Sequence, residues 1–264
     1  MMSLREPIAA GRTAEIYDWQ EGQILKLFRD GFPADSVEQE ARNARRVHAA
    51  GLPVPAVGDI IEINGRPGLI YERVEGPSLK DTITARLWTL FRSARLLAEL
   101  HADMHAGSTV PELPSQRQQL ERKIRAAEAL SPTLREAALK ALDKMPDGDS
   151  LCHGDFHPDN ILMSERGPVI IDWRDATRGN PLADVARSSV LLLGATAPGL
   201  RVPWLLKAIP RWLRIIYLRR YFQLRPADQG QFTAWQPIVA AARLSENISE
   251  LQDWLLHLVE AGLS

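Results

Sequence analysis

The segment that decides the fold reads Cys152-His153-Gly154-Asp155-Phe156-His157-Pro158-Asp159-Asn160-Ile161-Leu162, and Ile170-Ile171-Asp172-Trp173 follows it closely. Helical patterns on both sides give way here to a loop and two short apolar strands, Ile161 to Met163 and Val169 to Asp172. The turn between the strands is polar, around Glu165-Arg166-Gly167. Two carboxylates and an amide thus stand at fixed separations, a pattern that favours metal or proton handling over an ordinary surface turn.

Phosphoryl transfer needs these groups. One carboxylate must orient the attacking hydroxyl and accept its proton, and oxygen ligands must hold magnesium on the phosphates. Asp155 fits the first role, and Asn160 and Asp172 fit the second. The spacing resembles the catalytic loop of the aminoglycoside phosphotransferase and choline kinase family, which is related to the protein kinases. Asp159 competes with Asp155 as the base, but the spacing from Asp155 to Asn160 matches the family.

The resemblance also implies supporting residues. His153 is expected to pack and hydrogen-bond beneath the loop, and His157 resembles a histidine of the choline kinase branch. Asp184 either steadies the loop backbone or is a first-turn acid favoured by the helix dipole. His101 and His105 lie four apart on a predicted helix, a spacing compatible with metal binding, but no third ligand is evident in the sequence. We therefore expect packing rather than zinc.

The first part of the chain is predicted to form strands and one helix. Glu15 to Trp19 and Gln23 to Phe28 predict one hairpin. Ala56 to Ile63 and Gly68 to Val74 predict another around Asn64-Gly65. Between them we expect a helix over Ser36 to Ala50, with Asp35 or Ser36 as its N-cap and Gly51 as its stop. Beyond Gly76-Pro77, 3.6-residue periodicity predicts helices over Thr84 to His105, Ser115 to Leu130 and Pro132 to Lys144.

We accordingly predict a two-lobed, protein-kinase-like α+β fold. Residues 1–75 would form a nucleotide-binding lobe with a small antiparallel sheet, and residues 76–264 a helical lobe with the catalytic loop and substrate site.

Nucleotide contacts are expected in the first lobe. Gly11, Arg12 and Thr13 precede the first strand, where kinases fold a small-residue loop over the phosphates. Lys26 is a charge within a strand of apolar residues and needs an anionic partner or solvent. The resemblance makes it the lysine of the α- and β-phosphates, with Glu40 as its partner and Glu38 as the alternative.

The segment Glu72-Arg73-Val74-Glu75-Gly76 resembles the connection between kinase lobes. The carbonyl of Glu72 and the amide of Val74 would then bind the adenine edge, with Tyr71 at the back of the pocket. Because these contacts are main-chain, the side chains do not distinguish ATP from GTP.

Composition excludes several classes of protein. The 264 residues are 45% hydrophobic and 25% charged, which is typical of a globular protein. A net charge of −1 gives no global field for nucleic acid. The single cysteine, Cys152, cannot form an internal disulfide, and no apolar run is long enough to span a bilayer, so we expect a cytoplasmic protein. Its oligomeric state is left open.

The acceptor is predicted only as a small molecule with a hydroxyl. Acidic residues that could bind a polycationic aminoglycoside are Glu246, Glu250, Asp253 and Glu260. Against them stands a basic run, Trp204 to Phe222, with Lys207, Arg211, Arg214, Arg219 and Arg220. This run is either a solvated helix face or a surface for an anionic substrate, an acidic partner or lipid headgroups.

Two alternatives to a small-molecule kinase remain. One is a kinase-fold regulatory protein without turnover, but the presence of Lys26, Asp155, Asn160 and Asp172 argues against it. The other is a protein kinase, which the absence of the Asp-Phe-Gly and Ala-Pro-Glu signatures disfavours.

Overall fold

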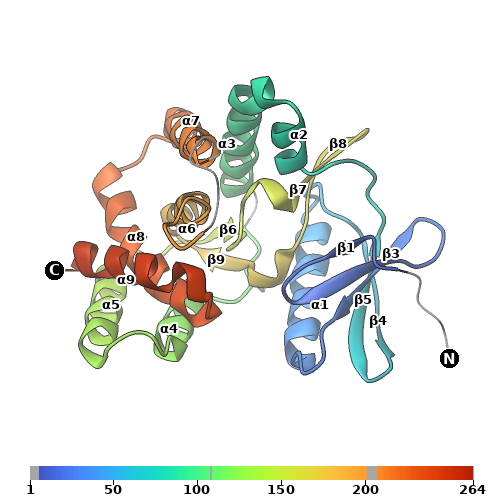
Figure 1. Ribbon diagram of the computed structural model, residues 1–264, viewed down its shortest axis with the longest axis horizontal. Coiled ribbons are helices and arrows are strands. Elements are labelled where there is room, and N and C mark those ends of the chain that lie inside the picture. The colour runs from blue at the N-terminus through green and yellow to red at the C-terminus, as the bar shows by residue number, and fades with distance from the viewer. Residues whose placement is uncertain (1–5, 108, 201–206, 264) are drawn as a thin grey trace. The chain divides into compact units, whose positions relative to one another are not determined.

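The computed structural model describes residues 6–107, 109–200 and 207–263. Its described residues fall into two compact units (Figure 1). Unit 1 holds the chain up to Leu79 together with residues 159–175, and unit 2 holds residues 80–158 and the chain from Ala176 onward. Unit 1 therefore includes Asn160 and Asp172, while the functional lobe boundary after residue 75 stays a prediction. Across the described ranges no helix is both long and apolar enough to cross a membrane.

Unit 1 contains a five-stranded antiparallel sheet in the order β1-β2-β3-β5-β4. Its strands are β1 (Ala9–Ala10), β2 (Ala14–Asp18), β3 (Gln23–Phe28), β4 (Val57–Ile63) and β5 (Arg66–Glu72). Both predicted hairpins are present. Asn64 and Gly65 have positive φ angles of 54° and 78°, the conformation that a tight turn between β4 and β5 requires. The two-residue strand β1 was not predicted because it is too short to show a period.

Helix α1 (Ala34–Ala49) lies beside this sheet and begins earlier than predicted. Its N-cap is Pro33, which makes no side-chain capping bond, so the prediction of Asp35 or Ser36 as N-cap is wrong. Proline has its φ angle pre-set and lacks an N–H, so it can start a helix without a polar cap. Asp35 instead lies in the first turn, where the helix dipole favours an acid. Gly51 follows the helix at φ 82°, as predicted for its stop.

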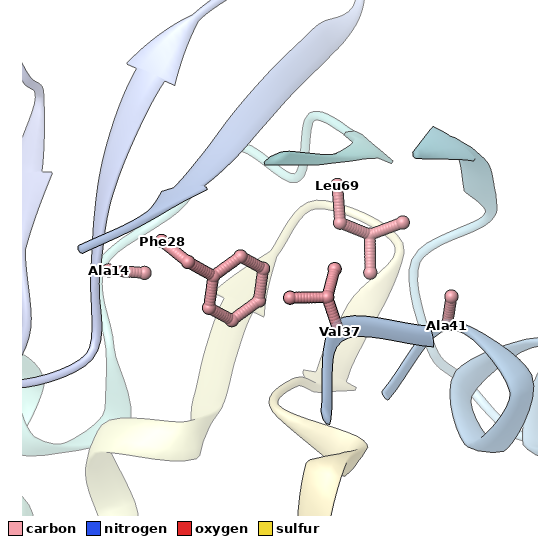
Figure 2. Packing of buried hydrophobic residues seen from close by; sticks show 5 residues of the cluster. All are labelled: Ala14, Phe28, Val37, Ala41 and Leu69. Carbon is pink, nitrogen blue, oxygen red and sulfur yellow. The ribbon is translucent and has the colours of Figure 1, made fainter. Parts of the chain in front are cut away.

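Successive side chains of β3 point to opposite faces of the sheet, and each face packs in a different apolar cluster. Leu25 and Leu27 point to one face, where they pack with Tyr17 and Ile63. Phe28 points to the other and packs with Ala14, Val37, Ala41 and Leu69 (Figure 2). Val37 and Ala41 belong to α1, so this cluster fixes α1 against the sheet. Lys26 and Glu40 lie on these same facing surfaces.

A third hairpin completes unit 1. It consists of β7 (Ile161–Ser164) and β8 (Gly167–Ile170), flanked by the short 3₁₀ helices η2 (Pro158–Asn160) and η3 (Trp173–Asp175). The amide of Met163 donates to the carbonyl of Pro77 at 2.9 Å, and that of Ile170 donates to the carbonyl of Pro53 at 2.9 Å. These bonds tie the hairpin to the segments flanking the sheet.

Unit 2 is mainly helical. Strands β6 (Ser150–Cys152) and β9 (Thr177–Gly179) pair antiparallel. The helices associated with it are α2 (Leu79–Ala85), η1 (Leu87–Thr89), α3 (Leu90–Ala106), α4 (Gln116–Ala126), α5 (Pro132–Lys144), α6 (Pro181–Gly194), α7 (Ala208–Leu224), α8 (Gln229–Arg243), η4 (Leu244–Glu246) and α9 (Ser249–Leu263). The expected helix Thr84 to His105 is divided, because Arg86 adopts φ −144° and ψ 83°. The expected helix Ser115 to Leu130 ends at Ala126.

Helix α6 forms the centre of unit 2, since every residue from Leu182 to Val190 is buried. Helices α3 and α7 lie side by side (Figure 1). His101 contacts Tyr217 and His105 contacts Tyr221, so the two helices contact each other over at least one turn. The loop that contains Asp155 follows β6 and is held from α6.

Candidate active site

Lys26 lies between two carboxylates of unit 1. Its Nζ is 2.6 Å from Oε1 of Glu40 and 3.1 Å from Oδ1 of Asp172. The hydroxyl of Tyr71 donates to the same Oε1 of Glu40 at 2.9 Å. Lys26 and Tyr71 reach Glu40 because alternate residues of neighbouring strands share the face that packs on α1. Glu38, the alternative partner, instead pairs with Arg42 on the helix surface at 3.0 Å.

Charge and burial oppose each other in this group. Burial lowers the pKa of Lys26, but Asp172 and Glu40 outweigh it and raise the pKa to about 12. Burial raises the pKa of Glu40, against the opposing effect of Lys26. Among the described residues, the buried Oε2 of Glu40 has no hydrogen-bond partner. The lysine is therefore cationic at neutral pH and fixed in position.

The hairpin of β7 and β8 brings Asn160 and Asp172 together. Ile161 pairs with Ile170, and the amide of Ile171 donates to the carbonyl of Asn160 at 3.0 Å. Asn160 and Asp172 therefore extend from opposite strands at the same end of the hairpin. Asp172 has φ 65°, a left-handed conformation that few non-glycine residues adopt. This turn ends β8 before Asp172, which is why the strand stops at Ile170 rather than at the predicted Asp172.

Asn43 holds the segment after Asp172 in place. Its side-chain amide donates to the carbonyls of Trp173 at 3.4 Å and Arg174 at 3.1 Å. Gln39 donates to the Oδ1 of Asn43 at 2.6 Å, which orients that amide. The sequence analysis did not identify Asn43. Its only signal is a polar residue on the apolar face of α1, three residues after Glu40.

The oxygen donors of Asn160 and Asp172 fit magnesium. Mg²⁺ prefers hard oxygen ligands and commonly takes one or two carboxylates from the protein. The side chain of Asp172 is 36% exposed, so a bound ion could keep waters and phosphate oxygens among its ligands. The amide of Asn160 and the carboxylate of Asp172 would hold such an ion.

The loop Gly11 to Thr13 is exposed or half-buried between β1 and β2. The guanidinium of Arg29 donates to the carbonyls of Gly11 at 3.0 Å and Arg12 at 3.1 Å, and its amide donates to Thr13 at 2.9 Å. Arg29 therefore holds the loop by donating to the loop's carbonyl oxygens. This arrangement was not predicted from the sequence. A methyl group on Gly11 would meet only ordinary contact, 3.6 Å from the Ala14 carbonyl.

The segment Glu72 to Gly76 leaves the sheet at the end of β5. The carboxylate of Glu72 accepts from the amide of Ala56 at 3.0 Å and from Arg166 at 2.6 Å, so its side chain is committed within unit 1. The amide of Arg73 donates to Gly22 at 2.9 Å. Adenine contacts at Glu72 and Val74 stay a prediction.

In unit 2, Asp155 is held by two basic side chains. Its Oδ1 lies 3.4 Å from NH2 of Arg187 on α6, and its Oδ2 lies 3.4 Å from Nε2 of His157. Its amide donates to Nδ1 of His153 at 3.2 Å. Burial raises the pKa of the Asp155 carboxyl, but His157 and Arg187 outweigh it and hold the pKa well below its usual range. Asp155 is therefore ionised at neutral pH.

Asp184 supports this loop from α6. Its carboxylate accepts from the amides of His153 at 2.7 Å and Gly154 at 2.8 Å. Of the two interpretations of Asp184, the structure shows the contact with the loop, although the residue also lies in the first turn of α6. Hydrogen bonds to the loop thus fix the backbone that carries Asp155.

His101 and His105 also contact Asp184. Their Nε2 atoms lie 3.1 and 3.3 Å from its Oδ2, so Asp184 is a third potential ligand that was not evident in the sequence. Their Nδ1 atoms contact the hydroxyls of Tyr217 at 2.6 Å and Tyr221 at 2.7 Å. All polar atoms of the three side chains thus have hydrogen-bond partners, which accounts for their burial without a metal ion. The contact of Asp184 with these histidines was not predicted, because Asp184 is 79 residues beyond His105 in the sequence.

The structure describes most of the residues that were predicted as candidates for acceptor binding. Of the basic run, residues 204–206 lie outside the described residues. Arg214 donates to Ser189 at 2.6 Å, and Arg220 pairs with Glu99 at 2.7 Å, while Arg211 and Arg219 are exposed. Glu246 pairs with Arg187 and lies 3.5 Å from Arg243. Two arginines thus oppose the charge of Glu246.

The family of this chain follows from a comparison with models of known protein families. A model of the phosphotransferase enzyme family (APH) matches residues 5–203. The chain belongs to the phosphotransferase enzyme family. The predicted resemblance and the predicted enzyme class, a kinase, are thereby confirmed.

Solved structures agree on the fold. A thermostable mutant of aminoglycoside phosphotransferase APH(4)-Ia, in a ternary complex with ADP and hygromycin B, has a TM-score of 0.69 at 18% identity over 98% of this chain and 92% of that one. A choline/ethanolamine kinase family protein from Mesorhizobium loti has a TM-score of 0.59 at 15% identity over 98% and 85%. At such identities the likeness shows the fold alone, and it confirms the predicted protein-kinase-like α+β fold.

Curated relatives match a smaller region. Acyl-CoA dehydrogenase family member 10 of Mus musculus is 31% identical over 179 residues, and acyl-CoA dehydrogenase family member 11 of Homo sapiens is 25% identical over 213 residues. These matches cover 59% and 69% of this chain but only 17% and 27% of those proteins. The chain therefore spans a minor part of the length of these relatives.

Proposed function

We propose that this phosphotransferase moves the γ-phosphoryl group of ATP, with magnesium, to a hydroxyl of a small molecule. The observation that carries the proposal is the position of Lys26 between Glu40 and Asp172. A buried lysine held by two carboxylates offers a fixed cation for phosphates, and Asp172 can offer an oxygen to the metal beside it.

The other roles follow from the family. Asn160 and Asp172 would hold Mg²⁺, which when bound neutralises charge on the phosphates. Asp155 would orient the acceptor hydroxyl and take its proton as the hydroxyl oxygen bonds to the γ-phosphorus. The bond from that phosphorus to the bridging oxygen breaks, and ADP leaves with the electron pair. Gly11, Arg12 and Thr13 would lie over the phosphates, and the backbone of Glu72 and Val74 would contact the base, which can be adenine or guanine.

The acceptor is proposed to be neutral or anionic rather than polycationic. Aminoglycosides carry several positive charges and require an acidic pocket, but Glu246 is already opposed by Arg187 and Arg243. Hygromycin B is bound in a structural neighbour, yet that neighbour is only 18% identical, so its ligand does not identify the acceptor here. We expect the reaction to take place in the cytoplasm, where ATP and magnesium are available.

Nucleotide binding tests the metal assignment. With Asp172→Ala, the affinity for a fluorescent ATP analogue should no longer increase when magnesium is added, because the phosphates lose their bridging cation. Asp30→Ala is the matched control, since Asp30 is a 91% exposed aspartate of the same unit. Equal magnesium dependence in the Asp172→Ala variant and the control would contradict the assignment.

A substrate screen tests the reaction itself. ATP consumption should be measured with aminoglycosides, amino alcohols, sugars, nucleosides and a protein mixture. Turnover with a small alcohol supports the proposal. Nucleotide binding without turnover of any acceptor would favour the regulatory alternative, and transfer only to protein would favour a protein kinase.

A further inference from the structure

Arg187 has no assigned part in the reaction, although it contacts the loop that carries Asp155. It lies on α6, three residues after Asp184, and is only 9% exposed. Its Nε donates to the carbonyl of Gly154 at 3.2 Å, and its NH2 lies 3.4 Å from Oδ1 of Asp155. One planar guanidinium thus contacts both the backbone and the side chain of adjacent residues in the loop.

The same guanidinium is held from the other side. Its NH2 also donates to Oε1 of Glu246 in η4, and Oε2 of Glu246 lies 3.5 Å from Nε of Arg243 on α8. Arg243 in turn donates to the carbonyl of Val190 on α6 at 3.3 Å. The chain of contacts Asp155, Arg187, Glu246 and Arg243 contains two positive and two negative charges, so its formal charge is balanced within unit 2.

We propose that Arg187 is a positioning residue that fixes the Asp155 carboxylate for the acceptor hydroxyl, with Glu246 and Arg243 holding the guanidinium in place. The inference rests on the proposed function, because it matters for turnover only if Asp155 is the base. Even with its backbone fixed, an aspartate has rotamers that face away from the acceptor. The donors of a guanidinium form a rigid planar fork, so the bond from Nε to the Gly154 carbonyl sets the direction from which NH2 meets Oδ1 of Asp155.

Two effects on the reaction follow. Fixing the carboxylate raises turnover because a misplacement of about 1 Å can cost roughly 100-fold. The positive charge of Arg187, with that of His157, keeps Asp155 ionised. Arg187 therefore acts on the reacting group through orientation, and its loss should lower kcat with little effect on nucleotide binding.

Four variants test the proposal: Arg187→Met, Arg187→Lys, Asp155→Asn and the control Arg135→Met. Arg135 is a half-buried arginine of the same unit that donates to the carbonyls of Ala127 at 3.0 Å and Leu130 at 3.2 Å. We expect Arg187→Met to lower kcat at least about 10-fold while the KM for ATP and the affinity for a fluorescent ATP analogue stay within about 3-fold. Arg187→Lys should recover part of kcat because it restores the charge, and Arg135→Met should keep it.

A thermal double-mutant cycle supplies a readout without turnover. If Arg187 contacts Asp155 directly, the melting-temperature changes of Arg187→Met and Asp155→Asn will not add in the double variant. Additive changes, or a kcat for Arg187→Met within about 3-fold of that for Arg135→Met, would overturn the inference while leaving the proposed function intact. Full turnover in Asp155→Asn, or no turnover of any acceptor by the unmodified chain, would overturn the proposed function and this inference with it.

Discussion

Asp155 is a weak base with a strong geometric role. The charges of His157 and Arg187 hold its pKa well below the usual range, so its advantage lies in being ionised and oriented. Asp155→Asn should therefore leave nucleotide affinity nearly unchanged and lower turnover at least about 100-fold.

Asp159→Asn is the matched comparison, because Asp159 lies four residues along the same segment and is the alternative base. Steady-state kinetics with the best acceptor from the screen would separate the two. A turnover for Asp155→Asn within a few-fold of the unmodified chain, with a collapse in Asp159→Asn, would transfer the role to Asp159.

At Gly76 the backbone passes too close to Met163 to leave room for a side chain. Gly76 has φ 140°, and a Cβ there would lie 2.1 Å from the carbonyl oxygen of Met163. Gly76→Ala should destabilise unit 1 by at least about 1 kcal/mol, because backbone must move to admit the methyl group. Gly11→Ala is the control, since its methyl group has room. Urea unfolding monitored by circular dichroism measures both, and equal stabilities would show that the connection tolerates the displacement.

At the scale of elements, helices α3 and α7 are linked by two buried histidine–tyrosine pairs. Tyr217→Phe removes the hydroxyl that contacts Nδ1 of His101 and leaves that nitrogen buried without its partner. We expect a loss of about 1–3 kcal/mol in unfolding free energy. Tyr17→Phe should cost less, because the Glu15 carboxylate that its hydroxyl contacts keeps Arg66 as a partner. Comparable losses of unfolding free energy in both variants would show that the buried His101–Tyr217 contact stabilises the fold no more than the Tyr17–Glu15 contact does.

Elements with a strong local signal could be predicted from the sequence. Asn64-Gly65 identified the turn between β4 and β5, and Pro132 to Lys144 matches α5 residue for residue. Ser131 caps that helix by accepting from the amide of Leu134 at 3.2 Å, so local chemistry fixes its start. The break at Arg86 was missed because Ala85, Arg86 and Leu87 are good helix formers and no glycine or proline marks the interruption.

Site residues could be predicted from the sequence only where they lie in or beside a short recognisable motif. The pairing of Lys26 with Glu40 follows from a strand and a helix that share one core, and the hairpin brings Asn160 to Asp172. Arg187 and Asn43 were not predicted, because their roles depend on contacts with residues 32 and 131 positions away in the sequence. Ordinary helix positions give no local signal for such contacts.

At the scale of the whole molecule, the buried histidines make stability depend on pH. Burial lowers the pKa of His101 to about 3, despite the opposing effect of Asp184, and burial also lowers the pKa of His105. Below about pH 6.5 the unfolded chain protonates these histidines while the folded chain keeps His101 neutral down to about pH 3. The unfolded state thus binds more protons, so stability must fall as the pH decreases through this window.

Each such histidine should reduce the unfolding free energy by up to about 1.4 kcal/mol per pH unit below its unfolded pKa. Urea unfolding between pH 7 and 5.5 measures the slope, and the difference in slope between a variant and the unmodified chain cancels the carboxylate titration that both share. His101→Gln should make the slope shallower by up to one proton, because the unfolded chain has one histidine fewer to protonate. Gln252→Ala removes an exposed side chain of the same unit that does not titrate, and it should leave the slope unchanged. If both variants give the slope of the unmodified chain, His101 is protonated in the fold within this range, and its hydrogen bond to Asp184 outweighs the cost of burying its charge.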